Sequence, residues 1–118
     1  MSQQTPDGKP WPYGWRTMWV FAFFDLPVET KPQRRAYTRF RKDLLEDGFS
    51  MMQYSVYYRH CASHENASVH VQRMGKMVPA EGEVRFMTIT DKQFAKIRTF
   101  IGRTRRTMPD KPAQMEMF

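Results

Sequence analysis

The sequence predicts an α+β fold, and three observations lead to this prediction. Strand-like and helix-like segments follow one another in the order strand, helix, strand, strand, helix, strand. Their lengths suit a single domain in a chain of 118 residues, and the connections between them are short. This order is that of the ferredoxin-like βαββαβ sandwich, which we prefer over a different two-layer α+β arrangement.

The first element is a continuous apolar run, TMWVFAFF, at residues 17–24. It is short for a helix, contains β-branched and aromatic residues, and lacks polar alternation. We therefore expect a central strand that is buried on both faces. Asp25 follows as the single carboxylate at the end of this strand, and Pro27 stops it.

A helix is expected after Thr30, which can cap its first turn, where Pro32 is tolerated. Gly48 is a natural stop at the C-terminal end. Between them, apolar residues recur at the spacing of one helix face. These residues are Ala36, Tyr37, Phe40, Leu44 and Leu45.

Residues 49–59 (FSMMQYSVYYR) are expected to form two short strands with an irregularity at 53–55. A second helix is expected to begin near Ser63, to run to about Val78, and to end at Pro79. Its buried side is predicted to carry Val71, Met74, Met77 and Val78.

Residues 83–90 (EVRFMTIT) are expected to form the next strand, and residues 91–101 a short helix stopped by Gly102. The tail AQMEMF, at residues 113–118, alternates enough to form an additional short strand. The chain therefore divides into three parts. These are a flexible N-terminal arm (1–15), the ferredoxin-like domain (16–102) and a basic C-terminal segment (103–118).

The composition favours a polyanionic partner. Lysine and arginine outnumber aspartate and glutamate by 19 to 12, which gives a formal charge of +7. Cys61 is the only cysteine, so the chain forms no internal disulfide and no cysteine-based metal cluster. No apolar run approaches the roughly 20 residues that cross a membrane, and the N-terminus lacks a secretory pattern. We expect a soluble, cytoplasmic protein with no membrane partner.

Two groups of cations are candidates for contact with nucleic acid, and Arg predominates in both, which suits forked contacts with phosphate. The alternative is a solvated charged face. The group on the first helix consists of Arg34, Arg35, Arg39, Arg41 and Lys42. The group near the C-terminus consists of Lys96, Arg98, Arg103, Arg105 and Arg106.

Five motifs in order resemble the Cas2 family of CRISPR adaptation proteins. They lie between residues 17 and 101, which is nearly the whole folded body, and the first and third most resemble the variant of type II systems. The motifs are FFDLP (23–27), Thr30–Lys31, QYSVY (53–57), GEVRF (82–86) and TITDKQF (88–94).

The resemblance implies a ferredoxin-like homodimer in which the C-terminal strand adds to the partner's sheet. The dimer would join two dimers of the Cas1 integrase, hold a duplex DNA (the prespacer), and help to insert it into the CRISPR array. The residues expected at the dimer interface are Gln114, Met115, Glu116, Met117 and Phe118.

The resemblance also implies a metal-dependent endonuclease, with Asp25 as a catalytic residue and a ligand of Mg²⁺ shared with its dimer mate. A metal nuclease site usually gathers two or more carboxylates, and only Glu29 lies near Asp25 in sequence. His60, His64 and His70 show no metal-ligand spacing and are interpreted as surface or cap residues. A structural role for Asp25, capping the loop at 26–30, therefore stays open beside the catalytic one.

Three functions are considered on this basis. The first is the DNA-binding platform of CRISPR adaptation, and the second is a stand-alone Mg²⁺-dependent endoribonuclease or DNase of the same fold. The third, an RNA-recognition module, needs exposed aromatic residues within a characteristic Lys/Arg-Gly-Phe motif. Tyr57 and Tyr58 have no such motif around them, so this reading is disfavoured.

Overall fold

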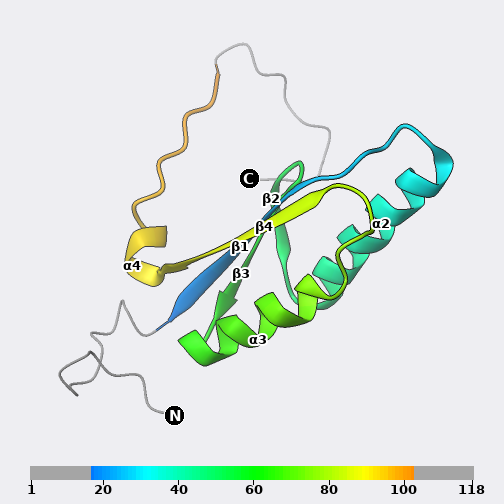
Figure 1. The fold of residues 1–118 in the computed structure, drawn as a ribbon. Coiled ribbons are helices and arrows are strands. Elements are labelled where there is room, and N and C mark those ends of the chain that lie inside the picture. Colours follow the sequence, from blue (N-terminus) through cyan, green and yellow to red (C-terminus); the bar gives the residue numbers. More distant parts are fainter. Residues whose placement is uncertain (1–16, 103–118) are drawn as a thin grey trace.

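The computed structural model describes residues 17–102 and shows one antiparallel sheet with the strand order β2-β3-β1-β4 (Figure 1). Helices α2 and α3 cover one face of this sheet. The chain order and the sheet order are those of the ferredoxin-like fold, which confirms the predicted fold class. The elements are β1 (Met18–Asp25), α2 (Lys31–Glu46), β2 (Ser50–Gln53), β3 (Val56–Cys61), α3 (His64–Gly75), β4 (Glu83–Thr90) and α4 (Asp91–Phe94).

The central strand β1 divides its side chains between the two faces of the sheet, because successive residues of a strand point to opposite sides. One set enters the core against the two helices, and it consists of Met18, Val20, Ala22 and Phe24. The other set lies on the face without helices, and it consists of Trp19, Phe21, Phe23 and Asp25. The expectation of a strand buried on both faces is therefore wrong at Phe23, which is 37% exposed.

Helix α2 begins and ends where the sequence predicts. Thr30 and Gln33 form a capping box: the Thr30 hydroxyl accepts from the Gln33 backbone N–H, and the Gln33 side chain accepts from the Thr30 backbone N–H. Gly48, just past the helix, has a φ of +97°, which favours glycine. Phe40 and Leu44 are buried in the core between α2 and the sheet.

Strands β2 and β3 form a hairpin whose turn is Tyr54–Ser55, with a register shift between Met51 and Gln53. This confirms the two predicted strands and the irregularity between them. Ser55 has a φ of +65°, and its carbonyl accepts a hydrogen bond from the backbone N–H of Phe24 at 3.0 Å. The turn is therefore fixed against the end of β1.

Helix α3 starts after its cap residue Ser63 and ends at Gly75, before the predicted end. Met74 is buried and Val71 packs against the core, as predicted. Met77, however, lies beyond the helix end and is 48% exposed, so its predicted burial is wrong. The position one turn before Met74 is taken instead by His70, which is 6% exposed.

Strand β4 has the predicted bounds, but α4 is much shorter than the helix expected over 91–101. The Phe94 ring stacks on Trp19 with 3.7 Å between ring centres, and the Asp91 carboxylate accepts from the Trp19 indole at 2.7 Å. In the segment after Phe94, Ile97 and Ile101 are 44% and 68% exposed, so a longer helix would have no buried apolar side there. A helix without a buried face is not stabilised by tertiary packing.

The proposed N-terminal arm, the basic segment 103–118 and its short strand lie outside the described residues, and so do their domain limits. Among residues 17–102, none of the helices has the length and apolar character needed to cross a membrane.

Candidate nucleic-acid interface

The predicted cations of α2 do not form one cluster, because they lie on two sides of the helix. Side chains three or four positions apart share a helix side. Arg35, Arg39 and Lys42 follow this spacing, and Lys31 extends the same row by one turn. Arg34 and Arg41 lie seven positions apart, about a quarter turn around the helix from the middle of this row. The row Lys31, Arg35, Arg39 and Lys42 is called the α2 row below.

The α2 row is free of internal partners. All four side chains are exposed, and within residues 17–102 none of them forms an ion pair or a hydrogen bond with another side chain. Their positive charges are therefore not neutralised by the described part of the protein. The ammonium and guanidinium groups of such a row can bind phosphate oxygens, but these contacts do not discriminate between base sequences.

Arg34 and Arg41 have contacts within the protein. One guanidinium nitrogen of Arg34 donates to the carbonyls of Val28 and Glu29 at 3.1 and 3.0 Å, which ties α2 to the loop after β1. The guanidinium of Arg41 lies close to the hydroxyl of Tyr57. Burial raises the pKa of Tyr57, and the charge of Arg41 partly offsets this effect. Both arginines therefore have structural roles that the sequence did not indicate.

The described part of the second predicted cluster, Lys96 and Arg98, lies on the other side of the sheet (Figure 1). Lys96 and Arg98 are exposed in the segment after α4, and α4 packs through Phe94 on the face that α2 and α3 do not cover (Figure 1). The structure thus does not bring these two cations together with the α2 row. The rest of that predicted cluster, namely Arg103, Arg105 and Arg106, lies outside the described residues, as does the predicted interface Gln114–Phe118.

Asp25 is exposed at the end of β1 on the face without helices. It does not cap the loop at 26–30: the amides of Glu29 and Thr30 in that loop donate to the Gln33 side chain instead. Within residues 17–102, no donor hydrogen-bonds to the Asp25 carboxylate. The predicted capping role is therefore wrong, and the carboxylate is available to an external partner.

The register of the sheet brings a second carboxylate beside Asp25. Glu83 is its direct partner on β4, on the same face, and Glu83 forms an ion pair with Arg85. Within residues 17–102 there is no group of three or more His, Cys, Asp or Glu side chains placed to hold a metal ion. Mg²⁺ is usually held by one or two carboxylates and several waters, so Asp25 and Glu83 could supply two oxygen ligands, although Glu83 is already paired with Arg85.

The three histidines have different surroundings. His60 is exposed and packs against Trp19 with 4.7 Å between ring centres, and His64 is exposed in the first turn of α3. His70 is not the surface residue that was expected. Its Nδ1 lies 2.7 Å from the Asp47 carboxylate, whose other oxygen bonds to Arg73. This contact ties α3 to the end of α2, so His70 is structural and remote from Asp25.

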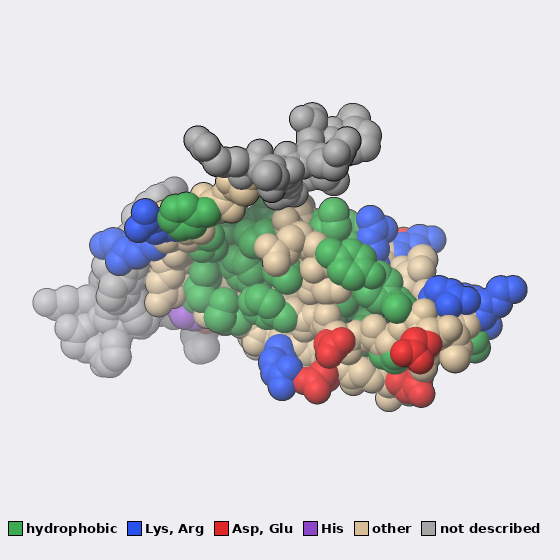
Figure 2. All heavy atoms as spheres, turned by 90° about the horizontal axis from the view of Figure 1, so that it is seen from above, with side chains coloured by type: hydrophobic (Ala, Val, Ile, Leu, Met, Phe, Trp, Pro, Cys, Tyr) green, Lys and Arg blue, Asp and Glu red, His purple; other side chains and the backbone are tan. Residues whose placement is uncertain are grey.

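The sheet face without helices is largely apolar. Phe21 is nearly buried there by the rings of Phe23, Tyr58 and Phe94, while Phe23 and Met87 stay 37% and 45% exposed. Figure 2 shows hydrophobic side chains gathered across the middle of one side of the molecule, with lysine and arginine toward both ends. An exposed apolar sheet face is typical of a protein–protein interface.

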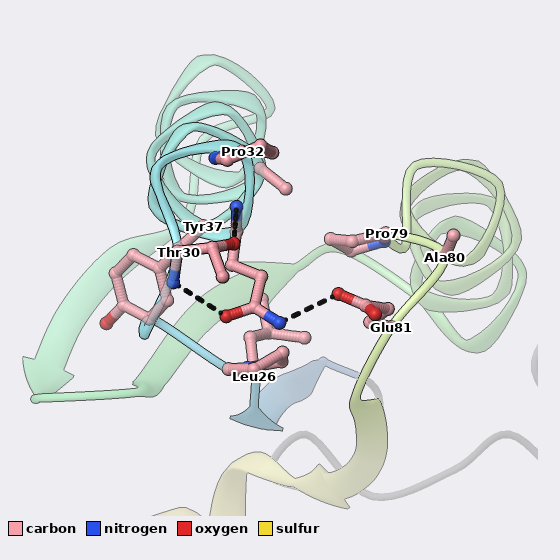
Figure 3. Close-up of a pocket in the computed structure, with 10 residues that line it drawn as sticks. Leu26, Thr30, Pro32, Tyr37, Pro79, Ala80 and Glu81 are labelled. Carbon is pink, nitrogen blue, oxygen red and sulfur yellow. Dashed lines mark hydrogen bonds between the residues drawn. The ribbon is translucent and has the colours of Figure 1, made fainter.

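A shallow hollow of about 520 Å³ lies between the start of α2 and the segment after α3 (Figure 3). Leu26, Pro32, Tyr37 and Pro79 line it, and the Gln33 amide spans it to reach Glu81 at 3.1 Å. The lining is mostly apolar, and its polar side chains Thr30, Gln33 and Glu81 bond to one another or to the backbone, so the hollow has the character of a packing groove.

Comparisons with known proteins place these features in a family. The family model described as "CRISPR associated protein Cas2" matches residues 18–97. A relative from Parvibaculum lavamentivorans named "CRISPR-associated endoribonuclease Cas2" is 63% identical over 101 residues, covering 86% of this chain and 100% of the relative. One of the same name from Flavobacterium psychrophilum is 48% identical over 105 residues, covering 88% of this chain and 90% of the relative.

Solved structures agree at the level of the fold. One named "Crystal structure of cas2" superimposes with a TM-score of 0.53 and 21% identity, covering 84% of this chain and 97% of its own. At this identity the likeness supports the fold alone. The family itself rests on the sequence match, and all five motifs that suggested it lie within the matched region.

Proposed function

Because the chain belongs to the CRISPR-associated Cas2 family, we propose that it serves CRISPR adaptation as a homodimeric platform for double-stranded DNA. In this role the dimer holds the prespacer duplex between the Cas1 integrase dimers that insert it into the array. The platform needs affinity for phosphate without preference for sequence, since spacers differ in sequence.

The single observation that carries this proposal is the α2 row. Its four cations are exposed and unpaired among the described residues, and they extend over twelve residues of α2, which is eleven steps along the helix. At a rise of 1.5 Å per residue the row is about 16 Å long. Phosphates of one DNA strand follow one another about every 3.4 Å along the duplex axis, so the row spans several of them.

The homodimer is supported by the sheet face without helices. Two copies that face each other through Phe23 and Met87 would bury the exposed apolar area of both, and a two-fold axis makes such an interface self-complementary. Because α2 and α3 lie on the opposite face, the α2 rows of the two copies would stay exposed on the outside of the dimer.

The second candidate is a Mg²⁺-dependent endoribonuclease, which the names of the relatives suggest. The observation that favours it is the free carboxylate of Asp25 on that same sheet face. A dimer through this face would bring two copies of Asp25, each with Glu83 beside it, to one interface. Together the two copies would supply four carboxylates, and oxygen is the ligand atom that Mg²⁺ prefers.

The platform is tested by the salt dependence of binding to a duplex of arbitrary sequence, measured by fluorescence anisotropy between 50 and 200 mM salt. For each phosphate that a variant no longer neutralises, the slope of log K against log salt is expected to flatten by about 0.9. We compare wild type with R35Q, R39Q and the double variant. The matched control is K76Q, an exposed lysine at the end of α3.

We expect both single variants to flatten the slope, the double variant to flatten it about twice as much, and K76Q to leave it unchanged. An unchanged slope in R35Q/R39Q would remove α2 from the DNA path. The nuclease candidate is tested separately with labelled RNA and Mg²⁺. It requires cleavage that chelation and D25N both abolish while duplex binding persists, and cleavage that survives D25N refutes it.

A further inference from the structure

We propose that the exposed ring of Tyr54 is a stacking site for an unpaired nucleobase, with Arg41 placed to contact the adjoining phosphate. The ligand is therefore single-stranded nucleic acid, or a single-stranded end of a duplex. This inference rests on the proposed function to the extent that the chain binds nucleic acid, but it concerns a surface on the side of α2 away from the α2 row.

The Tyr54 side chain combines high exposure with a fixed position. It lies in the turn between β2 and β3 and is 72% exposed. The next residue, Ser55, has a φ of +65° and is bonded through its carbonyl to Phe24 of the central strand. The backbone that carries the ring is therefore part of the sheet and not a loose loop.

One face of the Tyr54 ring is already stacked. The ring of Tyr37 on α2 lies 5.7 Å away between centres, with 20° between the two planes. Tyr37 is itself fixed: its hydroxyl lies 3.4 Å from the Ser55 Oγ, and burial raises its pKa to about 12. Tyr54 thus forms the outer layer of a two-ring stack, with its other face turned to solvent.

The charge around this stack suits a nucleotide. Arg34 and Arg41 lie three positions before and four positions after Tyr37, so they are on the same side of α2 as the stack. The positive charge of Arg41 lies close enough to the Tyr57 hydroxyl to lower the pKa that burial raises, so Arg41 is near the strand that follows the turn. An arginine positioned beside an aromatic ring is the combination that single-strand binding sites use.

A duplex cannot use this site in the same way, because its bases are already stacked on one another. An unpaired base has a free face, and stacking on an aromatic ring tolerates any base. Phe100 provides the internal comparison. It is more exposed, at 82%, but it lies in a segment without regular structure, and its ring lies under the Arg98 guanidinium, 5.4 Å from the ring centre.

The experiment measures the affinity of the full chain for three labelled probes: a short single-stranded oligonucleotide, the same strand with abasic positions, and a blunt duplex. The strand is tested as DNA and as RNA, which identifies the nucleic acid preferred. The variants are Y54L, which keeps an apolar cover over Tyr37 without a ring, and Y54F, which keeps the ring. F100L is the matched control for loss of an exposed aromatic side chain.

We expect Y54L to weaken binding of the intact strand about 5- to 150-fold, the range for loss of one stacked base. Binding of the abasic strand and the blunt duplex should be unchanged in Y54L, and Y54F and F100L should behave as wild type. Equal affinities of Y54L and wild type for the intact strand would overturn the inference. So would a wild type that does not distinguish the intact from the abasic strand.

The two proposals fail in different ways. If R35Q/R39Q leaves the salt slope of duplex binding unchanged, the platform fails whatever Tyr54 does. If duplex binding depends on the α2 row while Y54L leaves strand binding unchanged, only the Tyr54 inference fails. Loss of binding to all probes in Y54L, together with altered circular dichroism, would show that Tyr54 acts on folding and would also overturn the stacking role.

Discussion

A substitution at Gly82 tests whether this residue packs directly against the backbone at the end of β1. It has a φ of +92°, a conformation that side-chain-bearing residues rarely adopt. A Cβ added here would lie 2.7 Å from the carbonyl oxygen of Asp25 and 3.0 Å from the Cα of Leu26. Both of these atoms belong to backbone, which cannot rotate away as a side chain does. The variant G82A therefore has to move the strand end that carries Asp25.

The expected loss of stability in G82A is the sum of two contributions. The left-handed conformation costs about 1–2 kcal/mol for a residue with a Cβ, and forced displacement of packed atoms costs about 1–3 kcal/mol more. The expected loss in the free energy of unfolding is therefore about 2–5 kcal/mol. With a urea m-value of about 1–3 kcal/mol per molar for a small protein, the midpoint should fall by about 1 M or more.

Gly75 provides the matched control. It is the last residue of α3, and an added Cβ would meet no atom within 4 Å. Alanine is preferred to glycine within a helix, so G75A should leave stability unchanged or raise it by up to about 1 kcal/mol. Both variants are unfolded in urea at one protein concentration and followed by circular dichroism. Equal midpoints for G82A and wild type would refute the close approach of Gly82 to β1.

Two further predictions concern titratable side chains. Because burial raises the pKa of Tyr37 to about 12, folding favours its neutral form; stability should be constant below pH 10 and fall as pH rises from 10 to 12. Y37F should lose this part of the alkaline destabilisation in urea unfolding at pH 9 and 11, and an identical loss in both proteins would contradict the assignment. Cys61 is buried, and burial raises the pKa of its thiol, so the thiol should react with Ellman's reagent only after the protein unfolds. Complete reaction of the native protein within seconds would show that the thiol is accessible.

The sequence alone was sufficient for the order and type of the main elements. The apolar run of β1, the Thr30 cap and the Gly48 stop of α2, and the alternation of β4 are local signals, and each is read from residues adjacent in the chain. The family was recognisable for the same reason, since its motifs are short contiguous segments. The exposed position of Asp25 at a strand end also followed from where the apolar run stops.

Other features were decided by contacts between residues far apart in the chain. The helix expected over 91–101 is four residues long: Phe94 stacks on Trp19, 75 positions earlier, whereas Ile97 and Ile101 stay exposed. His70 is buried because Asp47, 23 positions earlier, is placed beside it. No local pattern contains either contact, so reasoning from neighbouring residues assigned a longer helix and a surface histidine.

The candidate site shows the same division. The sequence identified the basic character of α2 but not which of its cations lack a partner within the protein. Arg34 contacts carbonyls of the β1–α2 loop and Arg41 lies near the Tyr57 hydroxyl, and both partners come from other elements. Nor could the sequence show that Tyr54 stacks on Tyr37, since this depends on how α2 crosses the β2–β3 turn. Periodicity and capping act within a few residues and thus determine the elements. The availability of a charge or a ring depends on what the folded chain places next to it, and only the tertiary structure decides that.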